Sequence, residues 1–83
     1  MSNSTISDSL RMYIADEILD GQDIELENST PLLEWGILNS MEITRLVNFI
    51  EKEFNIEIPG DRIVIENLKD IDSITKLILE IRG

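Results

Sequence analysis

Apolar residues recur along the chain at the spacing of three amphipathic helices. In residues 6–18, 43–54 and 71–81 they return mostly every three or four positions, which places them on one face of a helix with about 3.6 residues per turn. The three faces consist of Ile6, Leu10, Tyr13, Ile14 and Ile18, then Ile43, Leu46, Val47, Ile50 and Phe54, and finally Ile71, Ile74, Leu77, Ile78 and Ile81. We expect these faces to pack together around one core.

Polar residues and glycines mark where these helices begin and end. Asn39 precedes Glu42 by three residues, a variant of the capping box in which Asn39 takes the cap role. Asp70 is a suitable cap for the last helix, which we expect to end at Gly83. Gly21 follows the first helix and predicts its stop.

The connections between the helices carry turn residues and a few apolar side chains. Thr30-Pro31 resembles a cap followed by proline at the first helical position, and Gly36 would close the brief turn after it. After the second helix we expect a loop, because the proline that follows Ile58 disfavours a helical backbone there. We expect Ile56 and Ile58 of this loop to fill part of the core.

Residues 61–68 are expected to hold one short helical turn before the last helix. The strand propensity of residues 63–65 leaves a second interpretation open, because periodicity cannot distinguish a strand from a buried turn in so short a run. Three longer helices and one or two short ones predict an all-α bundle. We expect one domain over residues 1–83, with residues 1–4 frayed.

Composition excludes several kinds of site. The 83 residues include no cysteine and no histidine, so the chain cannot form disulfides, thiolate or histidine metal sites, or a histidine-based catalytic centre. Apolar residues make up 42% of the chain, which is enough for one modest globular core and too much for a disordered tail.

The net charge is −10, from 17 acidic and 7 basic residues. Such a domain repels nucleic acid and anionic membranes, and it attracts basic surfaces on protein partners. No apolar run approaches the roughly 20 residues that span a bilayer, and the N-terminal segment does not resemble a signal peptide. We expect a cytoplasmic monomer that binds proteins and neither nucleic acid nor membranes.

The remaining catalytic candidates are carboxylates, hydroxyls, lysines and Tyr13. With 17 acidic side chains in so short a chain, neighbouring pairs are unavoidable, and pairs on solvated faces keep ordinary acidity. The sequence has no glycine-rich phosphate loop, and Asp20, Gln22 and Asp23 do not keep the register of a calcium-binding loop. We therefore expect neither an independent enzyme nor a metal site.

Ser40 lies between an apolar turn and the start of the second helix, in the stretch GILNSM of residues 36–41. A helix N-terminus stabilises an anion through its free N–H groups and its dipole, so a phosphodiester on Ser40 would lie in a favourable field. A serine in this place more commonly just caps the helix. The residues alone leave both roles open.

The order of these motifs resembles the acyl and peptidyl carrier proteins. The turn through Ser40, the helix ITRLVNFIEKEF and the exit NIEIP are similar to the family's attachment turn, second helix and following loop. The segment ENLKDIDSITKLI resembles the last loop and helix of freestanding, single-domain carriers. The resemblance extends over about residues 6–82 and implies the four-helix carrier-protein bundle.

The resemblance implies that Ser40 receives a 4′-phosphopantetheine arm from coenzyme A, with Asn39 and Met41 beside the attachment point. The thiol of the arm would hold an acyl or aminoacyl group as a thioester, so the chain needs no cysteine of its own. The implied partners are a phosphopantetheinyl transferase, an adenylating enzyme that loads the cargo, and downstream synthase or tailoring enzymes. The exit loop and the last segment favour nonribosomal peptide or polyketide-type secondary metabolism over a fatty-acid or D-alanyl carrier.

By the same resemblance the second helix is the main docking surface, helped by the loop before it and the short third helix. The candidate contacts are Leu38, Glu42, Arg45 and Ile63. For Arg45 the simpler interpretation is an ion pair with Glu42, one turn away. The acidic stretch between Arg11 and Arg45 is either a solvated loop or a rim that attracts basic partner enzymes.

Two residues depart from the family pattern. Asn39 stands where the family usually has aspartate, which keeps the cap but removes a negative charge beside the attachment site. This change keeps open an alternative function, a non-modified helical interaction module derived from the carrier fold. Met41 replaces the usual leucine at similar volume. We expect Trp35 to pack into the core or the loop rather than contact a ligand, and Met41 and Val47 to pack into the core rather than contact cargo.

Overall fold

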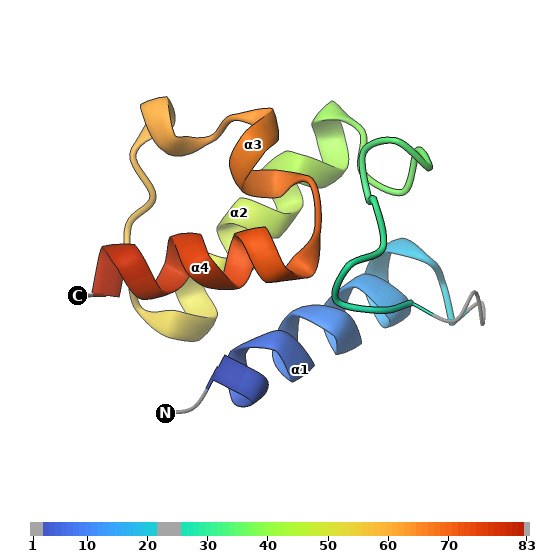
Figure 1. Ribbon diagram of the computed structural model, residues 1–83, viewed down its shortest axis with the longest axis horizontal. Helices are drawn as coiled ribbons and strands as arrows, with labels where there is room; N and C mark the ends of the chain where they lie inside the picture. The colour runs from blue at the N-terminus through green and yellow to red at the C-terminus, as the bar shows by residue number, and fades with distance from the viewer. Residues whose placement is uncertain (1–2, 22–25, 83) are drawn as a thin grey trace.

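Helices and the loops between them make up residues 3–21 and 26–82, the part of the chain that the computed structural model describes (Figure 1). The elements are α1 (Asn3–Tyr13), the π-helix η1 (Ile14–Ile18), α2 (Ser40–Phe54), the 3-10 turn η2 (Gly60–Arg62), α3 (Ile65–Leu68) and α4 (Ile71–Arg82). These described residues contain no strand, which excludes the strand interpretation of residues 63–65. The predicted all-α fold with three longer helices and a short third helix is confirmed.

The two chain ends fall partly outside the described residues. The expected frayed start comprises residues 1–4. Asn3 is the first residue of α1, and residues 1 and 2 lie outside the described residues. The last described residue is Arg82, so the predicted stop at Gly83 is also outside.

The predicted apolar faces of α1, α2 and α4 meet in one core. The fully buried side chains from these faces are Ile6, Leu10, Ile14, Leu46, Ile50, Ile71, Ile74, Leu77 and Ile78. The loops and α3 add Leu32, Leu38, Ile58 and Leu68, and Ile56 packs against the same cluster. The contribution of Ile56 and Ile58 to the core is therefore confirmed.

The first helix widens into the π-helix η1 before it stops. The Leu19 N–H donates to the Ile14 carbonyl at 2.9 Å, and the Gly21 N–H donates to the Ala15 carbonyl at 2.8 Å. Asp20 and Gly21 have positive φ angles of 57° and 80°, and this left-handed backbone ends the helix where the sequence predicts. The apolar spacing gives no sign of the π-helix, because one wide turn leaves the buried face intact.

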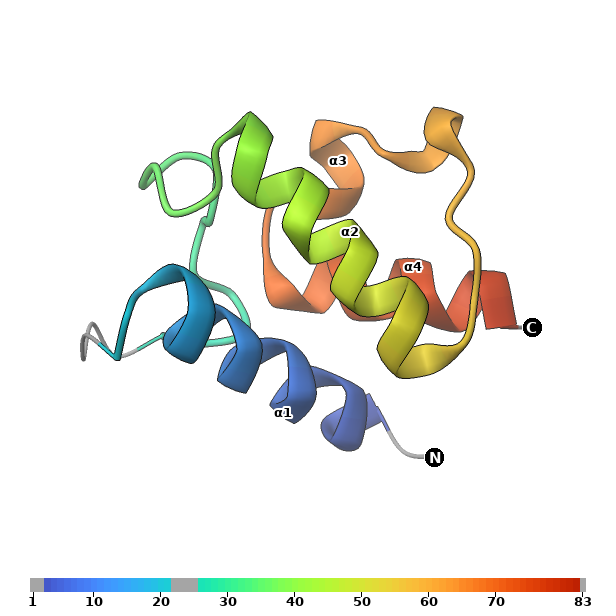
Figure 2. The same cartoon turned by 180° about the vertical axis from the view of Figure 1, so that it is seen from behind.

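The loop between η1 and α2 is held to the first and last helices (Figure 2). The Leu32 N–H donates to the Lys69 carbonyl at 2.8 Å, just before α4. The Asn28 carbonyl accepts from the Asp72 N–H at 3.1 Å, and the Asn28 side-chain oxygen accepts from the Arg11 guanidinium at 2.8 Å. Because this loop is fixed at several points, the position from which α2 starts is fixed as well.

The turn inside this loop differs in one detail from the prediction. The Thr30 hydroxyl accepts from the Glu27 N–H at 2.8 Å, so Thr30 closes the turn before it, and the predicted cap of the turn after it is wrong. The following turn forms with the Trp35 N–H donating to the Pro31 carbonyl at 3.0 Å. Gly36 ends it as predicted, with a φ of 74° that favours glycine.

Capping and a buried hydroxyl pair fix α4. The Asp70 carboxylate accepts from the Ser73 N–H at 2.7 Å, which confirms the predicted cap. The Ser7 and Thr75 hydroxyls lie 3.2 Å apart, and both residues are buried where α1 runs beside α4. The pair satisfies two polar groups inside the core and joins the first helix to the last.

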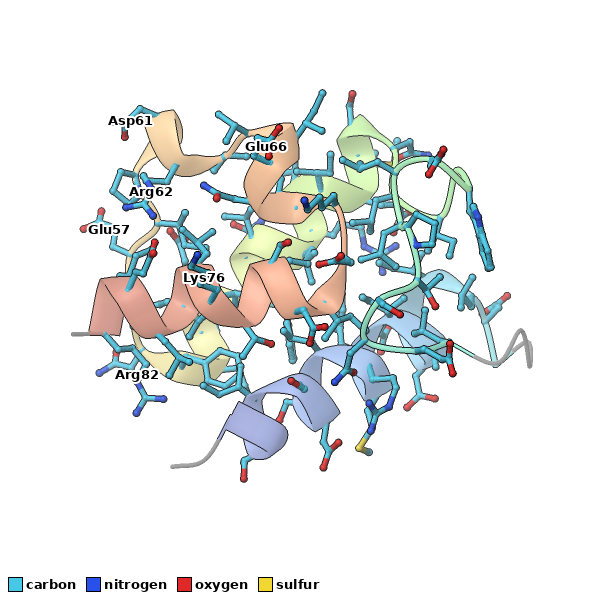
Figure 3. The ribbon with its side chains drawn as sticks, in the orientation of Figure 1. Glu57, Asp61, Arg62, Glu66, Lys76 and Arg82 are labelled. Atoms are coloured by element: carbon cyan, nitrogen blue, oxygen red, sulfur yellow. The ribbon has the colours of Figure 1, made fainter. Side chains whose placement is uncertain are left out.

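The segment between α2 and α3 is held from both sides. The Ile58 N–H donates to the Glu51 carboxylate of α2 at 2.9 Å. Arg62, labelled in Figure 3, forms an ion pair with Glu80 of α4, and its carbonyl accepts from the Asn67 side chain of α3 at 2.8 Å. These contacts place the short α3 near α2 and α4.

The cap of α4 gives a test of the fold. We expect Asp70→Ala to lower the free energy of unfolding by about 1 kcal/mol, because the Ser73 N–H loses its acceptor at the start of α4. Asp72→Ala is the matched control: it removes the same charge from the same helical turn, without the cap, and should cost only a few tenths of a kcal/mol. Urea unfolding followed by circular dichroism measures both, and equal losses would contradict the capping role.

Candidate functional site

Asn39 caps α2. Its backbone is extended, with φ of −105° and ψ of −177°, and its side-chain oxygen accepts from the Glu42 N–H at 2.9 Å. Leu38, directly before it, is buried in the core at 4% exposure. A buried anchor and a capped first turn together determine the residue at which α2 begins, and the predicted cap is confirmed.

Ser40 is the first residue of α2, and it is exposed. Its carbonyl accepts from the Thr44 hydroxyl at 3.2 Å, whereas its own hydroxyl has no hydrogen-bond partner among the described residues. The amides of Ser40 and Met41 lie in the first helical turn, where N–H groups lack an intrahelical acceptor and the helix dipole is positive. The site therefore offers a free hydroxyl beside a region that stabilises a phosphate.

Two apolar side chains near Ser40 point outward, contrary to expectation. Met41 is 70% exposed, because it lies on α2 roughly 140° away from the buried Leu46. Trp35 is 60% exposed, because Leu32 and Leu38 occupy the buried positions of the turn that Gly36 closes. The predicted packing of Met41 and Trp35 into core or loop is wrong, whereas Val47 does pack against the core.

The expected docking residues divide between surface and core. Leu38 is buried, so its expected docking contact is wrong: the side chain anchors the loop instead. Ile63 packs partly against the core. Val64 and Ile65, which follow it, are 43% and 73% exposed, and they were not among the expected contacts. The sequence did carry a signal of this exposure, because three consecutive apolar residues cannot all face one core.

Arg45 joins two elements through acidic side chains. Its guanidinium lies 3.2 Å from the Glu42 carboxylate, one turn earlier on α2, which confirms the predicted ion pair. It also lies 3.7 Å from the Glu17 carboxylate of η1, a partner that the sequence did not indicate. Arg45 and Glu17 are about half exposed, so this second pair stabilises the fold only weakly.

Tyr13 and Phe49 link α1 to α2 next to this charged group. Their rings are stacked, with centroids 4.2 Å apart and planes 18° from parallel. Burial raises the pKa of the Tyr13 phenol above its ordinary value of 10.0. The Arg45 guanidinium acts in the opposite direction, and the Glu42 and Glu17 carboxylates add to the rise.

Two further kinds of feature are absent among the described residues, a metal-binding group and a membrane-spanning helix. Within residues 3–21 and 26–82, no group of three or more acidic side chains gathers to hold a metal ion. Of the helices in that part of the chain, none combines the length and the apolar character needed to cross a bilayer.

Comparison with known proteins relates the chain to one family, one curated protein and one solved structure described here. The family described as the phosphopantetheine attachment site matches residues 8–78. The probable acyl carrier protein PigG of Serratia sp. is 31% identical over 71 residues, which cover 86% of this chain and 82% of that protein. A chain from a structure described as "Crystal structure of FAD-dependent dehydrogenase" superposes with a TM-score of 0.78 at 30% identity, over 83% of this chain and 97% of that one.

The raised pKa of the Tyr13 phenol leads to a prediction of how the free energy of unfolding depends on pH. Because the folded state raises the pKa of Tyr13, its contribution to stability is fully present below pH 10.0 and is lost as the pH rises through the higher folded value. We expect Tyr13→Phe to lose less stability than wild type between pH 9 and pH 12, because phenylalanine keeps the ring stack and cannot ionise. Urea titrations across that range measure the difference, and parallel curves would contradict it.

Proposed function

The chain belongs to the phosphopantetheine attachment family, whose members carry 4′-phosphopantetheine, and we propose that Ser40 is the residue to which this arm is attached. Proteins of this family are carriers and not catalysts, and they interact with phosphopantetheinyl transferases and synthase enzymes. One observation supports Ser40 in particular: Asn39 performs the capping, which leaves the Ser40 hydroxyl exposed at the helix N-terminus.

The first turn of α2 fits a phosphodiester. Attachment forms a bond between Ser40 Oγ and the phosphorus of the pantetheine phosphate, and it breaks the bond to the adenosine bisphosphate part of coenzyme A, which leaves. The hydroxyl proton goes to a base of the transferase, because the described residues place no acceptor at Ser40 Oγ. The new anion would lie beside the free amides of Ser40 and Met41, where the helix dipole favours negative charge.

We propose that the thiol of the arm carries acyl or aminoacyl groups of nonribosomal peptide or polyketide-type secondary metabolism. The Ile58-Pro59 exit and the segment from Ile65 to Ile78 support this over a fatty-acid or D-alanyl carrier. The site of action would be the cytoplasm, where coenzyme A is present. The structure described as an FAD-dependent dehydrogenase contains a chain of similar size and fold, which favours a flavin-dependent enzyme among the candidate tailoring partners.

The proposed docking surface takes residues from three elements. It comprises Met41, Glu42 and Arg45 on α2, Trp35 in the loop before α2, and Ile63, Val64 and Ile65 at α3. Trp35, Met41 and Ile65 are exposed apolar side chains, and such residues often supply much of the binding energy at an interface. The charge of −10 would attract basic surfaces of the transferase and of the loading enzyme.

Mass spectrometry tests the attachment site. We expect the apo protein, incubated with coenzyme A and a promiscuous phosphopantetheinyl transferase, to gain the mass of one phosphopantetheine group. Ser40→Ala should gain none, because the variant lacks the attacking hydroxyl. Ser29→Ala, which removes another exposed serine from the preceding loop, should gain as much as wild type.

Two outcomes would contradict the proposal. Wild type that gains no mass would favour the alternative, a non-modified interaction module with the carrier fold. A gain that persists in Ser40→Ala would place the arm on another residue.

The residue before the serine gives a second test. Asn39→Asp restores the negative charge that the family usually has there, and an aspartate can accept the same Glu42 N–H. We expect the variant to be modified severalfold faster at equal stability, because a basic transferase would approach the added charge. Intact-mass spectrometry measures the initial rate of modification, and thermal melts serve as the control for folding. An unchanged rate would refute the role given to Asn39.

A further inference from the structure

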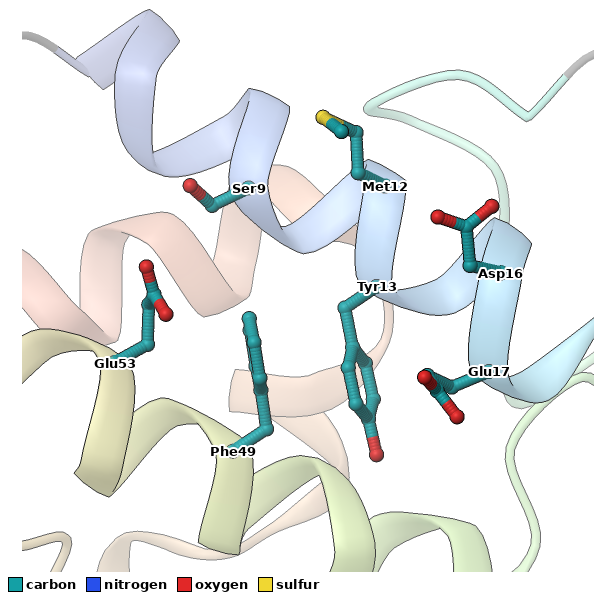
Figure 4. Close-up of a pocket in the computed structure, with 7 residues that line it drawn as sticks. All are labelled: Ser9, Met12, Tyr13, Asp16, Glu17, Phe49 and Glu53. Carbon is teal, nitrogen blue, oxygen red and sulfur yellow. The ribbon is translucent and has the colours of Figure 1, made fainter.

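A groove runs between α1–η1 and α2 (Figure 4). Its volume is about 280 Å³, and the residues that line it are Ser9, Met12, Tyr13, Asp16, Glu17, Phe49 and Glu53. Figure 4 shows the Phe49 and Tyr13 rings side by side, with Glu53 beyond one ring and Glu17 beyond the other. The groove thus has an aromatic centre and an acidic group at each end.

The centre of the groove can hold a flat cation or an apolar side chain. The Tyr13 and Phe49 rings are stacked and only partly buried, so part of their surface remains open to a ligand. Met12, which is 65% exposed, adds a thioether side chain. A guanidinium group packs favourably on such aromatic surface, and methionine adapts its shape to the side chain it meets.

The walls of the groove carry negative charge that the protein itself hardly neutralises. Asp16, Glu17 and Glu53 are all exposed, and no lysine or arginine of the described residues lines the groove. Glu17 has Arg45 as a distant ion-pair partner at 3.7 Å. Asp16 and Glu53 have no ion-pair partner within residues 3–21 and 26–82. The wall is therefore complementary to a basic ligand.

We propose that this groove docks a segment of a partner protein that presents an arginine next to an apolar side chain. The volume is below the roughly 300–1,000 Å³ of small-molecule pockets, so the groove has room for one or two side chains and not for a whole cofactor. The arginine would stack on the rings between Glu17 and Glu53, and the apolar neighbour would contact Met12.

The groove is separate from the attachment site. Phe49 lies nine residues after Ser40 on α2, which is roughly 14 Å along the helix axis. A partner held in the groove leaves the Ser40 hydroxyl accessible, so a tether of this kind raises the effective concentration of the partner near Ser40. The groove and its occupant do not depend on whether Ser40 is modified.

An NMR titration of the unmodified protein tests the groove. The probe is a short capped peptide with two Arg-Leu pairs, and the control peptide has citrulline, a neutral isostere, in place of each arginine. We expect the arginine peptide to shift the amide signals of Met12, Asp16, Phe49 and Glu53 and to bind at least about threefold more tightly than the citrulline peptide.

Two charge variants with equal net charge locate the binding. Asp16→Asn with Glu53→Gln should raise the Kd of the arginine peptide about threefold to tenfold. Asp61→Asn with Glu66→Gln removes two exposed charges outside the groove, at the α3 side of the molecule in Figure 3. This control should change the Kd of the arginine peptide less than about twofold.

Three outcomes would overturn the proposal. Equal weakening in both double variants would show attraction to the net charge alone. Shifts confined to the first turn of α2 would place the basic ligand at Ser40. Groove signals that move with protein concentration in the absence of peptide would assign the groove to a second copy of this chain.

Discussion

The hydrogen bond from the Glu42 N–H to the Asn39 side chain fixes where α2 begins, and the candidate site depends on that starting point. With Asn39 extended and capping, Ser40 is the first helical residue and its hydroxyl is left exposed. If α2 began one residue later, Ser40 would itself occupy the cap position, and its hydroxyl would be engaged with backbone N–H groups. Capping and attachment are thus separate tasks of neighbouring residues.

The cap can act only because the chain before it is held in place. Leu32 and Leu38 are buried at either end of the turn that exposes Trp35, and the Leu32 N–H is bound to the Lys69 carbonyl. The buried leucines give the loop its direction and leave Trp35 and Met41 outside. A single arrangement therefore builds the core beneath the site and the apolar surface around it.

Much of the fold is visible in the sequence because helical periodicity and caps are local signals. The buried faces around Ile6, Leu46 and Ile74, and the caps at Asn39 and Asp70, follow from spacing alone. The inward or outward direction of single apolar residues is harder to predict. Leu38 and Met41 are both apolar and lie close to Ser40 in the sequence, yet the loop before α2 buries Leu38 and the register of α2 exposes Met41.

Contacts between elements could not be predicted in the same way. The pairing of Arg45 with Glu17 requires the wide turn of η1 and the approach of that turn to α2, and neither has a local signal. The stack of Tyr13 on Phe49 also depends on how two helices meet. The groove is formed by the same meeting of helices, so the periodicity that found both faces could not reveal it.

Amide hydrogen exchange at Glu42 tests the separation of capping from attachment most directly. In Ser40→Ala the Glu42 amide should stay as protected as in wild type, because its acceptor is on Asn39. In Asn39→Ala the same amide should exchange faster, and α2 should lose about 1 kcal/mol of stability. Loss of Glu42 protection in Ser40→Ala, with protection retained in Asn39→Ala, would make Ser40 the cap and contradict this assignment of roles.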